Sequence, residues 1–151
     1  MIVMSRSPEE TRGLGERLGR GLRGLDVLCL HGDLGSGKTT FTQGLARGAG
    51  YQGRAVSPTF VLAKVYRAKK LTLYHLDLYR LAPGVTGDVG IEDYVSDPQG
   101  VCIVEWPQAG AAYYPKDRLE VYFSHEGGSG ERRIAFKARG PRFRGLLKDL
   151  K

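Results

Sequence analysis

Residues 32–39, with the sequence GDLGSGKT, have the residue types and spacing of a phosphate-binding loop, G-x-x-x-x-G-K-[ST]. Glycines permit the backbone torsions that turn successive N–H groups toward one anion, and the start of a helix adds further donors. Lys38 could then reach the β- and γ-phosphates, and the Thr39 hydroxyl could bind Mg²⁺. A chance match in a glycine-rich chain is the alternative. The segment lies between an apolar, strand-like run and a helical pattern, so we predict a nucleotide-binding P-loop.

Two acidic residues at strand ends are candidates for the metal-binding carboxylate that a P-loop site needs. Glu105 ends the apolar run VCIVE, and Asp77 lies in YHLDLYR, where alternation places His75, Asp77 and Tyr79 on one face. Either acid could instead be a surface carboxylate, but the P-loop favours a function for both. Asp33 lies within the loop itself, and we expect it to tune the loop rather than to bind metal.

Three further residues are weaker candidates. Thr59, in the segment SPTF, follows the P-loop helix at the distance of a switch and could sense the γ-phosphate, although the segment alone would be a common turn. Trp106 directly follows Glu105, and it either belongs to the core or covers the nucleotide site. For His75 we expect a packed strand histidine rather than a base.

The elements that must position these residues follow from capping and periodicity. Ser7, Pro8 and Glu10 form the start of a helix whose leucines, Leu14, Leu18 and Leu22, repeat every four residues. Further helices are expected over 38–47, 91–97 and 141–150, strands over 26–30, 60–68, 71–81 and 100–106, and a hairpin over 118–140. This order predicts an α/β fold of the P-loop NTPase type, a mixed β-sheet flanked by helices with a C-terminal β-hairpin, as one domain over 1–151.

Composition argues against a membrane-spanning protein, a cysteine metal site and a nucleic-acid-binding module. The chain has 151 residues, a net charge of +7 and no apolar run near the ~20 residues of a membrane helix. Its two cysteines, Cys29 and Cys102, lie in apolar runs without metal-ligand spacing, so we expect a cytoplasmic protein with free thiols. The positive charge is scattered without interleaved aromatic residues, which does not favour a nucleic-acid-binding module.

The segments GDLGSGKTT, SPTF, YHLDLYRL, GIEDYV and VEWP, in this order, resemble the TsaE family (formerly YjeE), which are small bacterial P-loop ATPases. The resemblance runs from about Ser7 to Pro107. It implies a role in making threonylcarbamoyladenosine on tRNAs that read codons starting with A. It also implies TsaB and TsaD as partner proteins, with TsaD transferring the threonylcarbamoyl group, and any tRNA contact made through that complex. No membrane partner is expected.

The resemblance also implies roles for individual residues, with ATP and Mg²⁺ as cofactors. Lys38, Asp77, Glu105 and Thr59 would be catalytic, and Thr39 and Glu105 would bind Mg²⁺. Trp106 would belong to the nucleotide site, Ser7 and Thr11 would lie near the adenine, and Arg132 or Arg133 would reach the nucleotide. The ATP phosphate site would comprise Leu34, Gly35, Ser36, Gly37, Lys38, Thr39 and Thr40.

The chain departs from the family pattern at one place. Relatives commonly carry an acidic helix after DLYRL, where this chain has APGVTGDVG, which is poor in helix formers. Two other functions remain as alternatives. A small-molecule kinase would use the same P-loop, and a non-enzymatic nucleic-acid-binding module would use the positive charge.

Overall fold

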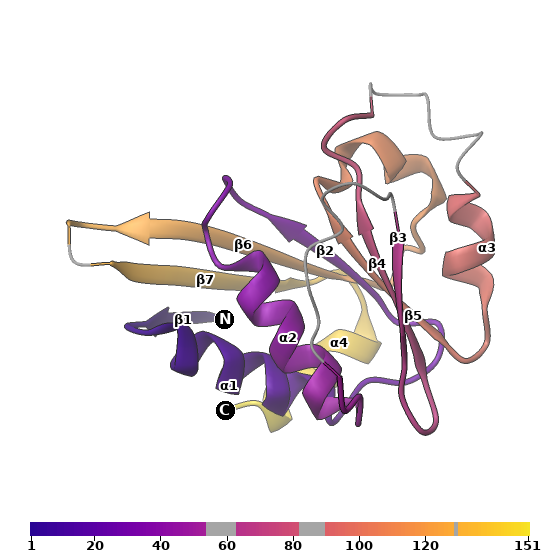
Figure 1. Ribbon diagram of the computed structural model, residues 1–151, viewed down its shortest axis with the longest axis horizontal. Helices are drawn as coiled ribbons and strands as arrows, with labels where there is room; N and C mark the ends of the chain where they lie inside the picture. The colour runs from indigo at the N-terminus through magenta and orange to yellow at the C-terminus, as the bar shows by residue number, and fades with distance from the viewer. Residues whose placement is uncertain (54–62, 82–89, 129) are drawn as a thin grey trace.

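A computed structural model describes residues 1–53, 63–81, 90–128 and 130–151. Its centre is a seven-stranded mixed sheet in the order β1-β7-β6-β2-β5-β4-β3, with helices packed on it (Figure 1). This confirms the predicted fold class. The segment SPTF with Thr59 lies outside the described residues, and so does nearly all of APGVTGDVG.

The parallel core of the sheet consists of β2 (Val27–His31), β5 (Gly100–Glu105), β4 (Thr72–Asp77) and β6 (Leu119–Glu126). β5 pairs in parallel with both β2 and β4, and β2 also pairs in parallel with β6. The sequences of β2 and β5 are almost continuously apolar because helices cover both faces of these strands. Since parallel strands end at one edge, the loop after β2 and the acids that end β4 and β5 lie together.

Antiparallel strands complete the sheet on both sides. β3 (Ala63–Arg67) pairs with β4, and β7 (Glu131–Ala138) pairs with β6 as the predicted C-terminal hairpin. β1 (Ile2–Ser5) pairs with β7 at the edge, and sequence analysis missed this strand. The β1–β7 pairing joins the two ends of the chain, so local sequence carried little signal for it.

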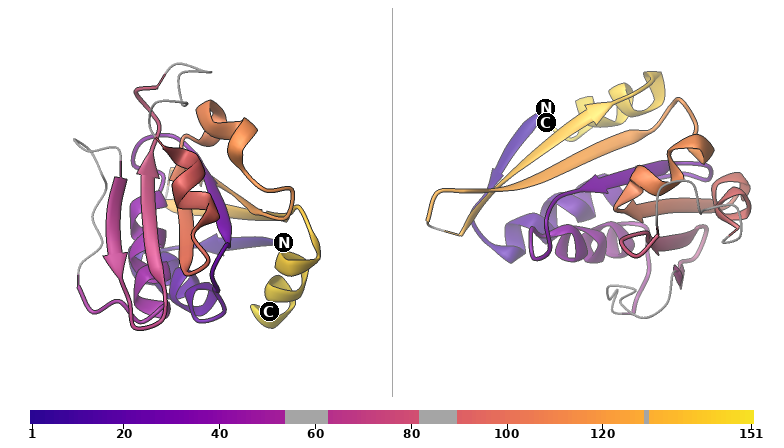
Figure 2. Two further views of the ribbon diagram at one scale, coloured as in Figure 1. Left: turned by 90° about the vertical axis from the view of Figure 1, so that its right-hand side faces the viewer. Right: turned by 90° about the horizontal axis from the view of Figure 1, so that it is seen from above.

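The helices divide between two cores on opposite faces of the sheet (Figure 2). Leu28 and Leu30 of β2 pack with α1 (Pro8–Gly19), α2 (Lys38–Gly48) and α4 (Pro141–Asp149). Val27 and Cys29 point the other way, toward α3 (Ile91–Ser96) and the 3-10 helix η2 (Pro107–Tyr113). None of the helices in the described ranges is long and apolar enough to cross a membrane.

Helices α1 and α2 pack with their backbones in direct contact. A Cβ atom added to Gly15 would lie 2.3 Å from the Phe41 carbonyl oxygen, and one added to Gly44 would lie 2.0 Å from the Arg12 carbonyl oxygen. Gly19 and Gly48 repeat this arrangement one turn further along. These glycines therefore set the distance between α1 and α2, and α2 directly follows the P-loop.

Several element boundaries differ from the sequence prediction, most of them by one residue, and β4 ends at Asp77 rather than at Leu81. β2 begins at Val27 rather than Asp26, because the backbone N–H of Asp26 donates to the Arg23 carbonyl oxygen at 3.2 Å in a turn. The Asp26 carboxylate accepts hydrogen bonds from Arg142 at 2.7 and 3.0 Å and so joins α4 to the start of the strand. α1 ends at Gly19, although Leu22 of the predicted leucine repeat is still buried in the same core.

Candidate functional site

The loop between β2 and α2 encloses a cavity at the carboxyl edge of the sheet. Gly32, Gly35 and Gly37 have φ values of +148°, +75° and +111°, which a side chain would disfavour. Gly37 occupies the N-cap position of α2 and has no side chain to cap it, so the first N–H groups of α2 stay available to an anion. The cavity has a volume of about 200 Å³ and is lined by Leu34, Gly35, Ser36, Gly37, Lys38, Thr39, Thr40, Asp77, Glu105 and Arg132.

Lys38 is held in this cavity with only 4% of its surface exposed. Its ammonium group donates hydrogen bonds to the carbonyl oxygens of Gly32 and Asp33. Burial lowers the pKa of Lys38, while the nearby carboxylates of Glu105, Asp77 and Asp33 act in the opposite direction. The loop therefore fixes the amine at the cavity, at the electrostatic cost of removing it from water.

Asp77 and Glu105 come together because β4 and β5 pair in parallel with these two residues in register. Glu105 is 4% exposed, and its Oε1 atom lies 2.8 Å from Nε2 of His75. The Oδ1 atom of Asp77 accepts a hydrogen bond from the backbone N–H of Tyr79 at 3.0 Å. Within the described ranges no three His, Cys, Asp or Glu residues gather to hold a metal ion. A metal here would need other ligands, such as Thr39 and phosphate oxygens.

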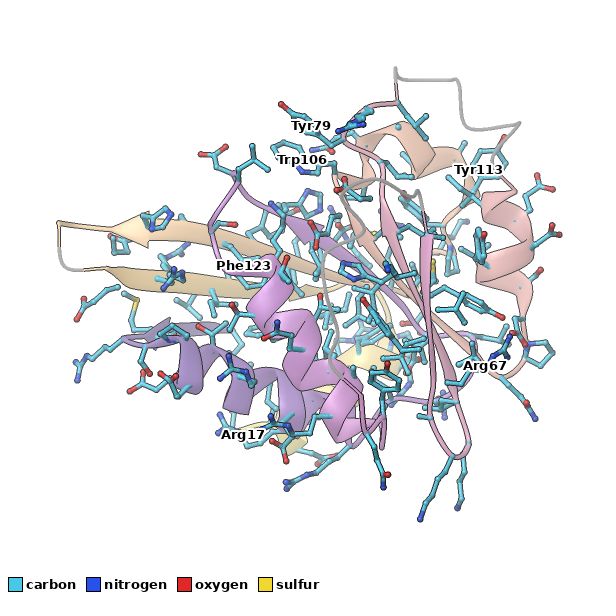
Figure 3. The ribbon with its side chains drawn as sticks, viewed as in Figure 1. Arg17, Arg67, Tyr79, Trp106, Tyr113 and Phe123 are labelled. Carbon is cyan, nitrogen blue, oxygen red and sulfur yellow. The ribbon has the colours of Figure 1, made fainter. Side chains whose placement is uncertain are left out.

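Trp106 lies over the amine of Lys38, with Nζ 4.7 Å from the centre of its ring. Its backbone adopts a φ of +54°, which is unusual for a bulky residue and turns the chain sharply after Glu105. The ring of Tyr79 lies 4.9 Å from that of Trp106, and the two side chains lie side by side (Figure 3). Trp106 is thus placed against the P-loop lysine, and its role in covering a nucleotide stays a prediction.

Arg132 of β7 reaches the P-loop from the C-terminal hairpin. Its Cδ atom would be 3.1 Å from a Cβ atom added to Gly37. Two polar atoms here, Nε of Arg132 and Oγ of Ser36, are buried and have no hydrogen-bond partner in the described part of the chain. An N–H donor and a hydroxyl beside a lysine and open helix N–H groups are the donor set that a phosphate requires.

Three predicted site residues lie elsewhere or outside the described ranges. The Oγ atom of Ser7 caps α1 by accepting from the backbone N–H of Glu10 at 3.1 Å. Thr11 is fully buried, and its hydroxyl lies 2.7 Å from that of Ser5, although its methyl group is close to Gly37. Neither residue lines the cavity, and Thr59 is not among the described residues. Their contacts with a nucleotide stay predictions.

Sequence reasoning underrated His75. The structure confirms a fully buried strand histidine, but its side chain also contacts Glu105 across two strands. The alternation that placed His75 beside Asp77 was the available signal. It could not reveal Glu105 as the partner, because that contact depends on the pairing of β4 with β5.

The strand, glycine-rich loop and helix, with two acids on neighbouring parallel strands, define an α/β protein of the P-loop class. The sequence profile of the family described as "Threonylcarbamoyl adenosine biosynthesis protein TsaE" matches residues 5–134. The chain therefore belongs to the TsaE family.

Individual relatives agree with this assignment. The tRNA threonylcarbamoyladenosine biosynthesis protein TsaE of Bacillus subtilis is 40% identical over 95% of this chain and 89% of its own length. The protein of the same name from Treponema pallidum is 43% identical over 80% of this chain and 89% of its own length. The crystal structure of Bacillus subtilis YdiB superposes with a TM-score of 0.82 and 36% identity, covering 99% of this chain and 93% of that one.

Proposed function

We propose that this protein is a Mg²⁺-dependent ATPase that acts with TsaB and TsaD to make threonylcarbamoyladenosine on tRNAs that read codons starting with A. Membership of the TsaE family supports the role in tRNA threonylcarbamoyladenosine biosynthesis. One observation carries the ATPase part of the proposal. The P-loop cavity combines Lys38 and two acids with buried donors on Ser36 and Arg132 that lack partners within the described residues.

Each lining residue has a role in this proposal. The backbone N–H groups from Gly35 to Thr40 cradle the phosphates of ATP, and Lys38 and Arg132 neutralise their charge. The Thr39 hydroxyl and Glu105 hold Mg²⁺, which when bound offsets the negative charge of the phosphates. Asp77, on the neighbouring strand, supports the metal site. Ser7 and Thr11 would lie near the adenine, and Thr59 near the γ-phosphate.

The isolated protein is expected to hydrolyse ATP slowly. Among the described residues that line the cavity there is no glutamine to position a water molecule. Gln43 accepts hydrogen bonds from Arg12 at 3.4 Å, which engages its carbonyl oxygen away from the lining residues. In P-loop proteins that lack a catalytic group, a partner that supplies it accelerates hydrolysis by about 10³–10⁵-fold.

The test is phosphate release from ATP, measured with and without TsaB and TsaD. We expect slow Mg²⁺-dependent release by the protein alone and a large increase when both partners are present. Rapid release that partners do not change would indicate a stand-alone NTPase. Transfer of the γ-phosphate to an added small acceptor, without release, would indicate the kinase alternative. Absence of ATP turnover under all conditions would favour the remaining alternative, a non-enzymatic nucleic-acid-binding module.

A further inference from the structure

We propose that His75 is a positioning residue that fixes the Glu105 carboxylate in the orientation that binds Mg²⁺. This inference rests on the proposed function, in which Glu105 is a metal ligand. His75 comes from β4 and Glu105 from β5, so the contact bridges two strands of the sheet. The first observation is the distance of 2.8 Å between Nε2 of His75 and Oε1 of Glu105.

The hydrogen bond engages one oxygen of Glu105. Its Oε1 atom accepts from His75, and no hydrogen bond within the described residues occupies Oε2. Glu105 lines the P-loop cavity together with Thr39. A carboxylate held through one oxygen cannot rotate freely about its last torsion, so Oε2 keeps one direction available for a metal. Partners of this kind orient ligating side chains in many metal sites.

The second ring nitrogen of His75 also has a partner. Its Nδ1 atom lies 3.4 Å from the hydroxyl of Tyr66, and the two ring centres are 6.1 Å apart. A carboxylate accepts hydrogen bonds, so Nε2 must carry the proton, and Nδ1 of a neutral ring is then an acceptor for the Tyr66 hydroxyl. The Glu105 carboxylate therefore selects this tautomer, and the Tyr66 hydroxyl, which can donate, is compatible with it.

Packing alone does not explain a histidine at this position. His75 is 0% exposed, and Leu73 precedes it on the same face of β4 in an apolar core. An aliphatic residue would fill the space without the cost of burying a polar ring. The buried ring is instead satisfied at both nitrogens, with the end that faces the site bonded to Glu105.

Two substitutions separate positioning from packing. His75→Gln places an amide N–H near the former Nε2 position and can still donate to Glu105. His75→Asn places its amide near the former Nδ1 position, so it can meet Tyr66 but cannot reach Glu105. Circular dichroism and thermal melting show whether each variant folds.

The measurement is calorimetric titration with a non-hydrolysable ATP analogue, in EDTA and over a range of Mg²⁺ concentrations. We expect His75→Asn to raise the Mg²⁺ concentration for half-maximal tightening of binding by about 10- to 100-fold, the usual cost of losing such a partner. Binding in EDTA should be unchanged, because it depends on the P-loop. His75→Gln should stay within a few-fold of the wild type. An unchanged Mg²⁺ requirement in His75→Asn, or an equal loss of binding in EDTA, would overturn the proposal.

Two controls keep this inference distinct from the proposed function. If Mg²⁺ fails to tighten binding in the wild type, or Glu105→Gln leaves the Mg²⁺ requirement unchanged, the metal assignment itself is wrong. If the His75 variants do not fold, ¹⁵N NMR of the wild-type histidine rings still tests the geometry. A proton on Nε2 of His75 supports the proposal, and a proton on Nδ1 alone contradicts it.

Discussion

Arg132 and Arg133 are adjacent in β7, but strand alternation points their side chains to opposite faces of the sheet. Arg132 shares its face with the core residues Ile134 and Phe136 and reaches the P-loop. We predict that Arg132→Ala weakens ATP binding by about 10- to 100-fold, because charge-assisted hydrogen bonds contribute roughly 1.5–3 kcal/mol. Equilibrium titration with a fluorescent ATP analogue measures this change.

Arg133→Ala is the matched control, since it removes the same charge one residue away. Its affinity for the analogue should stay within about threefold of the wild type, as expected of a screened surface charge. Equal losses in the two variants would mean that net charge, rather than a contact at the P-loop, attracts the nucleotide.

Lys38 is the residue on which turnover depends most. We predict that Lys38→Ala loses at least about 100-fold in the rate of ATP hydrolysis, because neutral alanine cannot stabilise charge that develops on the phosphates, a contribution often near 3 kcal/mol. Phosphate release under single-turnover conditions is the measurement. Lys70→Ala, in the exposed β3–β4 turn, is the control. Full activity of a folded Lys38→Ala variant would contradict the P-loop assignment.

The candidate site could be predicted from sequence only where its residues are close along the chain. The P-loop motif, the acid that ends the apolar run VCIVE and the alternation around Asp77 were visible because each is a local pattern. Arg132 was a candidate only through the family resemblance, which did not distinguish it from Arg133. Choosing between the two arginines requires knowing which face of β7 meets the P-loop. The contact of His75 with Glu105 depends on strand register, which the sequence does not encode locally.

The packing of α1 against α2 determines where the P-loop sits. We predict that Gly44→Ala destabilises the protein by roughly 1–3 kcal/mol, because the added methyl group meets the Arg12 carbonyl oxygen, and backbone cannot move aside as a side chain can. The midpoint of urea unfolding measures the loss. Nucleotide affinity should fall as well, because α2 begins at Lys38.

Gly13→Ala, in the neighbouring helix α1, should change the stability of the protein in the opposite direction. A Cβ atom on Gly13 would meet nothing within 4 Å, so replacing this helical glycine should stabilise the protein by about 0.5–1 kcal/mol. If both variants change stability in the same direction and by the same amount, then helix propensity, rather than close packing of the backbones, determines the effect of replacing these glycines.

Element prediction succeeded where hydrophobic periodicity or turn chemistry was strong. The start of α1, the strands β2 and β5, the C-terminal hairpin and α4 all followed from capping, apolar runs or glycine-rich turns. β1 was missed because four residues are too few to show alternation, and the partner strand β7 lies more than a hundred residues away. The 3-10 helix η2 was missed because PQAGAAY has no apolar period.

At the scale of the whole molecule, β6 and β2 are joined by a charged cluster on the face opposite the P-loop helix. Glu120 of β6 is 5% exposed, and its carboxylate lies 2.6 Å from both Nε2 of His31 and Nε of Arg118. His31 ends β2 directly before the P-loop, and its ring stacks on Tyr122 at 4.4 Å. The cluster therefore ties the C-terminal hairpin to the strand that leads into the site.

This cluster should make stability depend on acid pH. Burial alone would raise the pKa of Glu120, but the hydrogen bonds from His31 and Arg118 outweigh it, so the pKa is lowered from its ordinary value of 4.5. The folded protein then binds this proton less tightly than the unfolded chain does. The stabilisation is present above about pH 4.5 and is lost as the pH falls through the lowered folded-state pKa. We predict that Glu120→Gln lowers the free energy of unfolding by about 1–3 kcal/mol at pH 7, the usual value of hydrogen bonds to a charged group.

The difference between the wild type and Glu120→Gln should begin to shrink below about pH 4.5 and approach zero as the pH falls through the lowered folded-state pKa, because the wild-type carboxyl group then becomes uncharged in the folded protein as well. Urea unfolding followed by circular dichroism between pH 7 and pH 3 measures both curves. Glu126→Gln, at the exposed end of β6, controls for the loss of one negative charge and should leave stability nearly unchanged. Two results would contradict this prediction: a Glu120→Gln variant as stable as the wild type at pH 7, or a stability difference that grows in acid. Either result would mean that the hydrogen bonds from His31 and Arg118 do not outweigh the desolvation penalty of the buried carboxylate.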